Sequence, residues 1–135
     1  MRTLSLLPPL LLLAACAAER EPFSPVHQVS YSAVGENPFW SLAIGDDAIV
    51  LTFGSNSRPG RGALESVRYP RVLPRTVNGV TRWESGEGTA VIAVEAQPGP
   101  CTGSRGVRFE DRVVVRLSGR QLNGCGGRIL SRGAR

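Results

Sequence analysis

Short apolar runs separated by turn residues recur from Gln28 towards the end of the chain. Within the runs apolar and polar residues alternate, and glycine, aspartate, asparagine or proline stands at their ends. This period of two is typical of β-strands, and helical spacing appears nowhere at length. The candidate strands cover 29–33, 39–44, 48–53, 72–77, 80–84, 89–96, 111–117 and 121–125, with 63–69 as a further one.

The segments between these runs favour antiparallel pairing. Asn78-Gly79 lies between two runs and is the strongest short-range hairpin signal in the chain. Two longer segments, 54–62 and 97–108, are expected to be loops. About eight short strands at this spacing predict an all-β domain, built as a small antiparallel barrel or sandwich.

Residues 1–15 have a different pattern. Arg2 precedes an apolar run, Leu4–Leu13, and small residues then lead to Cys16. This order is that of a secretory leader, and the run is too short for a transmembrane helix of roughly 20 residues. The ending Leu-Ala-Ala-Cys resembles the lipobox of bacterial lipoproteins, which implies that Cys16 is lipidated. An ordinary cleaved leader with a chance cysteine is the alternative.

A lipidated Cys16 is expected to anchor the protein to a membrane, because each buried methylene contributes about 0.8 kcal/mol. Ala17 and Ala18 follow the cysteine, and resemblance to sorted lipoproteins then favours the outer membrane. The expected location is therefore the bacterial cell envelope, on the periplasmic side of the outer membrane. The expected regions are a lipoprotein signal peptide (1–15), the lipidated cysteine with a polar tether (16–27), the β domain (28–130) and a tail (131–135).

The chain is basic, with a formal net charge of +5, and all 16 basic residues are arginine. A basic domain held at a membrane favours anionic lipid or polysaccharide, whereas nucleic acid is an unsuitable partner for an exported protein. Solvated strand faces and edge protection explain most of the arginines, and a basic patch for an acidic partner is the alternative. The arginines gather near two hairpins, at Arg68, Arg71, Arg75 and Arg82, and at Arg105, Arg108, Arg112, Arg116 and Arg120.

Cys101 and Cys125 remain as a pair once Cys16 is lipidated. In an oxidising compartment an even pair of cysteines predicts a disulfide. A metal site or a redox pair is a weaker alternative, because neither cysteine lies in a Cys-x-x-Cys motif or near a histidine. We therefore expect no metal and no cofactor.

Two segments resemble a family of uncharacterised bacterial envelope lipoproteins. The family has an N-x-P-F-W opening motif, which Asn37-Pro38-Phe39-Trp40 resembles without a residue between asparagine and proline, and a closing G-C-G motif, here Gly124-Cys125-Gly126. Its domains occur beside META-type lipoprotein domains and lysozyme-inhibitor-like domains. The similarity covers most of residues 29–127, and the chain departs from it at Thr102–Gly106, where the family has an acidic and Met-Ser segment. The family has no settled activity to imply.

The opening motif also has a physical interpretation. In a strand, Phe39 and Trp40 point to opposite faces, so that one fills the core and the other covers a barrel mouth. The alternative is that Trp40, Phe39 and Asn37 bind a ligand, with an aromatic ring stacked on it as in sugar recognition.

No catalytic residues can be assigned from the sequence. The serines have no histidine partner other than His27, and the pairs Asp46-Asp47 and Glu110-Asp111 stand in a turn and at a strand start, where solvated charge is ordinary. The leading hypothesis is a non-enzymatic envelope module that binds a protein or a glycan. The alternatives are a β-barrel that binds a small ligand and, less favoured, an envelope hydrolase with two carboxylates across a cleft.

Lipidation generates the first testable prediction. Intact-mass spectrometry of the native protein should show a polypeptide that begins at Cys16 and carries acyl chains, and Cys16→Ser should abolish both the added mass and the membrane association. An unacylated protein that still begins at Met1 would contradict the whole interpretation of the N-terminus.

Overall fold

The computed structural model describes residues 25–54 and 64–133. Cys16 and most of the expected loop 54–62 lie outside the described residues. No helix of the described ranges is long and apolar enough to span a membrane. The elements are β1 (Tyr31–Gly35), β2 (Trp40–Ile44), β3 (Ala48–Gly54), β4 (Leu64–Pro70), β5 (Arg75–Val77), β6 (Val80–Glu87), β7 (Ala90–Thr102), the 3₁₀ helix η1 (Ser104–Gly106), β8 (Arg108–Leu117) and β9 (Arg120–Ser131).

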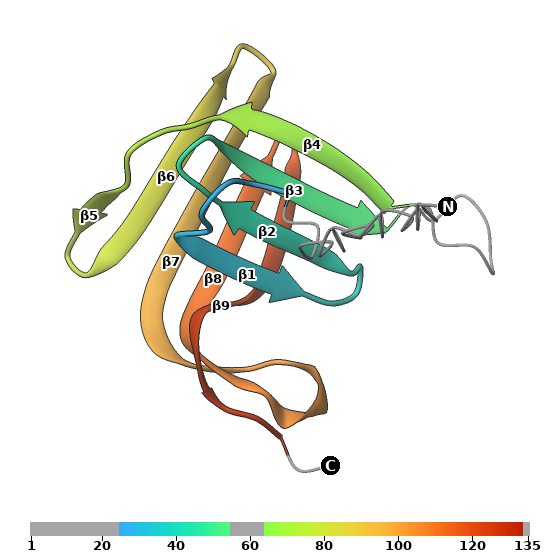
Figure 1. Cartoon of the computed structure of the whole chain (residues 1–135), viewed down its shortest axis with the longest axis vertical. Helices are drawn as coiled ribbons and strands as arrows, with labels where there is room; N and C mark the ends of the chain where they lie inside the picture. The colour runs from blue at the N-terminus through green and yellow to red at the C-terminus, as the bar shows by residue number, and fades with distance from the viewer. Residues whose placement is uncertain (1–24, 55–63, 134–135) are drawn as a thin grey trace, which may run out of the picture.

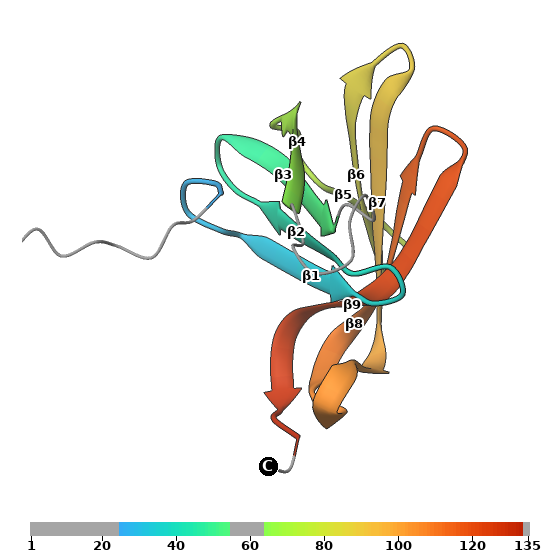
Figure 2. The same ribbon diagram turned by 90° about the vertical axis from the view of Figure 1, so that its right-hand side faces the viewer.

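All nine strands of the described ranges belong to one sheet, in the order β4-β3-β2-β1-β9-β8-β7-β6-β5. Every neighbouring pair is antiparallel. The sheet curls into a half-barrel, with β1 to β4 on one side and β6 to β9 on the other (Figures 1 and 2). The all-β, antiparallel prediction is confirmed, and the architecture is one curled sheet instead of a closed barrel or a two-sheet sandwich.

The core lies between the two sides of the half-barrel. Alternation along each strand sends every second side chain inward, so that Leu42 of β2, Leu51 of β3, Val94 of β7 and Val115 of β8 are all almost fully buried. The two sides also meet through Tyr31 and Trp83, whose ring centroids are 4.9 Å apart. Burial of this apolar surface is the main favourable term that holds the sheet in its curled form.

Trp40 occupies a slot lined by glycine backbone. A Cβ atom on Gly35 would lie 2.1 Å from Nε1 of Trp40, and a Cβ atom on Gly124 would lie 2.6 Å from its Cζ2 atom. Gly35 pairs with Trp40 across β1 and β2, while Val34 pairs with Cys125 across β1 and β9. The opening and closing motifs of the sequence therefore pack against each other, and their shared role in the fold is structural.

The Asn78-Gly79 hairpin forms as expected between β5 and β6. Val77 pairs with Val80 across the two-residue turn. Asn78 and Gly79 have φ angles of 51° and 78°, the positive values that both central positions of a type I′ turn require.

The prediction of a loop over 97–108 is wrong. β7 instead continues to Thr102, and the loop shrinks to the few residues around η1. A register shift between Pro98 and Cys101 marks a bulge, which bends the strand without ending its pairing with β8. Proline and glycine at 98–100 signalled a break in the chain, but tertiary pairing with β8 overrides that local signal. The last strand is also longer than expected, because β9 continues past Cys125 to Ser131.

Cys101 and Cys125 form the expected disulfide, with their Cα atoms 5.5 Å apart. Cys101 belongs to β7 and Cys125 to β9, so the bond passes over β8, which lies between those strands in the sheet. It therefore fixes the bent end of β7 to the strand that joins the two sides of the half-barrel.

The disulfide generates a stability prediction. The cysteines are 24 residues apart, and in the chain-entropy model a loop of this size contributes about 3.5 kcal/mol to the free energy of unfolding. The double variant Cys101→Ser/Cys125→Ser should lose roughly 3–4 kcal/mol in urea titrations. Reduced wild-type protein is the matched control and should show the same loss, whereas a double variant as stable as oxidised wild type would contradict the prediction.

Candidate functional site

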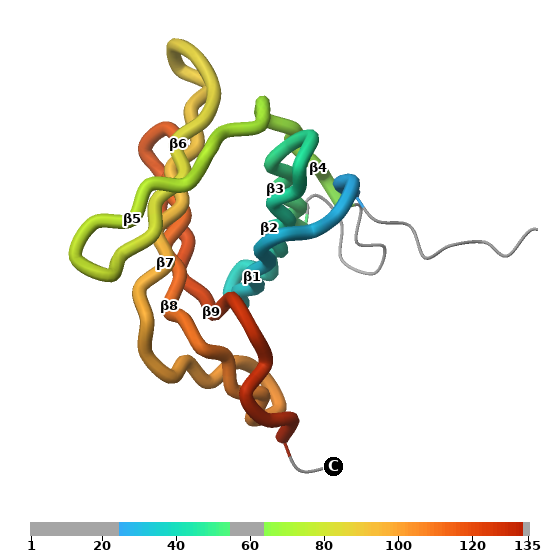
Figure 3. The backbone as a smooth tube through the Cα atoms, turned by 60° about the vertical axis from the view of Figure 1, so that its left-hand side comes forward, coloured from blue at the N-terminus to red at the C-terminus, as the bar shows by residue number. Residues whose placement is uncertain are grey.

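A groove of about 890 Å³ opens on the side of β6, β7 and β8 that faces away from the core. Alternation places Trp83 and Val94 inward and leaves Arg82, Glu84 and Glu95 on the groove side. β5 and its turn extend away from β1 to β4 and supply one wall (Figure 3). The segment around β5 therefore forms one wall of the groove, and the outward side chains of β6, β7 and β8 form the rest of its lining.

Glu95 lies at the centre of a small charge network in the groove. Arg116 donates a hydrogen bond to it, with 2.8 Å between Nη1 and Oε2, and Arg82 donates to its other oxygen. The side chain of Glu95 is only 18% exposed. The hydrogen bond from Arg116, reinforced by Arg82, lowers the pKa of Glu95 below its ordinary value. At neutral pH Glu95 is therefore deprotonated, and its negative charge is balanced by the two arginines.

Two further arginines face the groove without such a partner. Arg75 pairs with Arg82 across β5 and β6, and Arg112 pairs with Gln97 across β7 and β8. Neither Arg75 nor Arg112 forms an ion pair within residues 25–54 and 64–133. The guanidinium group of Arg112 is held close to the backbone, since a Cβ atom on Gly99 would lie 3.4 Å from its Nη2 atom. The groove thus presents unpaired positive charge from two of its walls.

The carboxylates of the groove do not suit acid–base catalysis. A glycosidase needs one carboxylic acid with a raised pKa as the proton donor. The pKa of Glu95 is lowered by its arginines, and Glu84 lies 3.7 Å from Arg82 in a surface ion pair. Glu95 therefore does not have the raised pKa that the proton donor of a glycosidase needs.

The three residues of the expected aromatic ligand site do not form one surface. Trp40 is 1% exposed and fills the core, which agrees with the structural interpretation of the opening motif. The alternative that its ring stacks on a ligand is wrong, because the ring is buried. Phe39 is on the other face of the chain and is 52% exposed, and Asn37 is exposed in the turn between β1 and β2. None of the three lines the 890 Å³ groove. Ligand binding by Phe39 and Asn37 stays a prediction.

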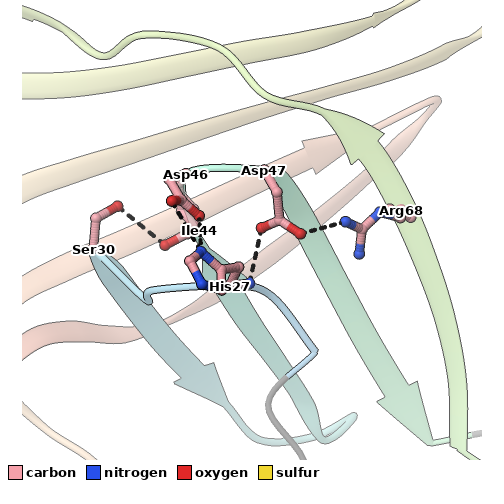
Figure 4. A network of polar contacts seen from close by, with 6 residues as sticks. All are labelled: His27, Ser30, Ile44, Asp46, Asp47 and Arg68. Carbon is pink, nitrogen blue, oxygen red and sulfur yellow. Dashed lines mark hydrogen bonds and ion pairs between the residues drawn. The ribbon is translucent and has the colours of Figure 1, made fainter.

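A second polar cluster surrounds His27 at the start of the described chain (Figure 4). Nδ1 of His27 lies 3.0 Å from both carboxylate oxygens of Asp46, and the backbone N–H of His27 donates to Asp47 at 2.9 Å. Arg68 donates to Asp47 at 2.6 Å and to the carbonyl of Pro25 at 3.2 Å. Residues 25–27 are therefore fastened to the turn between β2 and β3.

Val26 belongs to the same attachment. It is 4% exposed and forms a small apolar cluster with Ala48 and Val50 of β3. The folded unit thus includes Val26 and His27, which the sequence interpretation assigned to the tether, because the outward side of β3 is apolar at these two positions.

Ser30, which lies near this cluster, donates its hydroxyl hydrogen to the carbonyl of Ile44 at 3.0 Å (Figure 4). Among the described residues no hydrogen bond joins Ser30 to the imidazole of His27. In the part of the chain that the structure describes, no three His, Cys, Asp or Glu side chains gather in a way that would hold a metal ion. The cluster is an attachment point for the N-terminal segment.

The sequence contained a partial signal for the groove. Arg75, Arg82, Arg112 and Arg116 were assigned to two separate hairpins as solvated charge, with a basic patch as the alternative. The structure brings these four arginines to one side of the sheet, since β8 lies beside β7 and β7 beside β6. Glu95 neutralises Arg82 and Arg116 only because these strands are neighbours, so the local sequence around Glu95 could not reveal this role.

Comparison of the chain with protein-family models, with curated proteins and with solved structures gives no match.

The His27 cluster generates a pH prediction. The hydrogen bond with Asp46 raises the pKa of His27 above 6.5. The pairing of protonated His27 with Asp46 therefore adds to the free energy of unfolding fully below pH 6.5, and this contribution is lost as the pH rises through the folded-state pKa. NMR titration of His27, the only histidine of the chain, should show this raised pKa, and Asp46→Asn should return it towards 6.5. Asp47→Asn is the control, with a smaller effect, and an unchanged His27 pKa in Asp46→Asn would contradict the assignment.

Proposed function

We propose that this chain is a lipid-anchored protein of the bacterial cell envelope whose β domain is a non-enzymatic binding module. Cys16 supplies the anchor, and the groove of β5 to β8 supplies the contact surface. The resemblance of the opening and closing motifs to envelope lipoproteins agrees with this proposal, as does the pairing of Cys101 with Cys125, because disulfides persist in oxidising compartments.

The observation that carries the binding role is the unpaired charge of the groove. Arg75 and Arg112 face a concave surface without an ion pair among the described residues, while Glu95 is neutralised by its own arginines. Guanidinium groups without an ion-pair partner in a concave surface attract anionic groups of a partner and steer its approach. The groove therefore favours a negatively charged partner.

A small anionic molecule is the second candidate occupant. The volume of about 890 Å³ lies within the range of roughly 300–1,000 Å³ that ligand pockets occupy. The contact surface remains the same groove, and Trp40 takes no part because it is buried.

Site-specific photo-crosslinking in cells tests the binding role. A photo-reactive phenylalanine analogue at Val77, which lines the groove and is 62% exposed, should form an adduct with an envelope component. The double variant Arg75→Gln/Arg112→Gln should lower the adduct yield by more than about tenfold, because each arginine is expected to contribute a charge-assisted hydrogen bond of at least about 1.5 kcal/mol.

The same analogue at Leu130 is the matched control, since this residue is 47% exposed on β9 and does not line the groove. Adduct formation at Val77 only supports the groove as the contact surface. Equal yields at both positions, or no adduct at either, would contradict the proposed function.

A further inference from the structure

The groove combines its unpaired guanidinium groups with aliphatic side chains. Leu73 and Val77 are 74% and 62% exposed on the β5 side, and Val80 and Val114 line the groove from β6 and β8. Asn78 and Gln97 add amide groups that donate and accept hydrogen bonds. A complementary partner therefore carries negative charge and aliphatic groups together.

The lining argues against a sugar. Carbohydrate rings are held by flat aromatic side chains, on which their apolar faces stack, yet no tryptophan, tyrosine or phenylalanine lines the groove. The nearest sequence candidates, Trp40 and Phe39, lie elsewhere, one in the core and the other outside the groove. An acidic glycan would satisfy the arginines and leave the aliphatic side chains without a partner.

The arginines favour carboxylates that are spaced along an extended partner. A guanidinium group donates two parallel hydrogen bonds to one carboxylate, which gives direction as well as charge. Arg75 and Arg112 stand on opposite walls, β5 and β8, with the paired Glu95 between them on β7. Because β7 and β6 separate β8 from β5 in the sheet, an extended chain with two acidic groups matches the placement of the two arginines better than a single small anion does.

We propose that the groove binds an extended protein segment that carries acidic and aliphatic side chains on the same face, at every second position. The acidic groups pair with Arg75 and Arg112, and the aliphatic groups cover Leu73, Val77 and Val114. This inference rests on the proposed binding function and adds the chemical class of the partner.

Fluorescence polarisation on the full, oxidised chain tests the inference with defined probes. The test probe is a labelled eight-residue peptide of the sequence Glu-Ser-Val-Ser-Glu-Ser-Val-Ser, which presents glutamate and valine on one face when extended. Its matched partners replace every glutamate by glutamine or every valine by serine. We expect the glutamate–valine peptide to bind at least about tenfold more tightly than either partner, and to weaken strongly at high salt.

Charge-matched variants locate the binding surface. Arg75→Gln and Arg112→Gln should each weaken binding of the glutamate–valine peptide about tenfold, because each removes a charge-assisted pair. Arg132→Gln removes the same charge from an exposed position outside the groove and should leave the affinity within about twofold. Equal weakening by all three variants would show that only net charge matters, and would overturn the inference.

Two further probes separate this inference from the proposed function. An oligogalacturonate represents acidic glycans, and vesicles that contain phosphatidylglycerol represent anionic lipid. Tighter binding of either probe, lost in Arg112→Gln, overturns the protein-segment inference and leaves the binding function intact. If no probe binds but Val77 still forms its adduct in cells, only the inference fails; if the adduct is also missing, both fail.

Discussion

The structure depends on the close approach of backbone to the ring of Trp40, where the two sides of the half-barrel meet. β1 and β9 pair over a short stretch, with Ala33 opposite Gly126 and Val34 opposite Cys125. Gly35 and Gly124 have no Cβ atom, and this absence gives the indole its space. Dispersion and apolar burial at this point hold together two sets of strands that would otherwise share few hydrogen bonds.

Much of the fold could be predicted from the sequence because period-two alternation is a local property. The burial of one of the Phe39 and Trp40 rings follows from that alternation. The Asn78-Gly79 turn follows from another local property, because both residues tolerate the positive φ angles of a type I′ turn. The continuation of β7 beyond Gln97 could not be predicted, since Pro98 and Gly99 are turn residues and only the neighbouring β8 keeps the segment in the sheet. Curling into one half-barrel is likewise a consequence of long-range pairing.

The candidate site shows the same division between local and long-range information. The sequence shows how many arginines the chain has and where they stand along it. Which arginines are neutralised depends on strand register, because Glu95 lies directly opposite Arg82 in β6 and close to Arg116 of β8. Arg75 and Arg112 keep their charge available because no acidic residue stands in the corresponding position.

The attachment of Val26 and His27 has a directional consequence. These residues hold the beginning of the described chain against β2 and β3, whereas β5 extends from the opposite side of the molecule (Figure 3). Under the proposed anchoring at Cys16, the turn between β2 and β3 would lie on the side of the domain nearest the bilayer. The arginine groove would then face away from the membrane, where a macromolecule has room to approach.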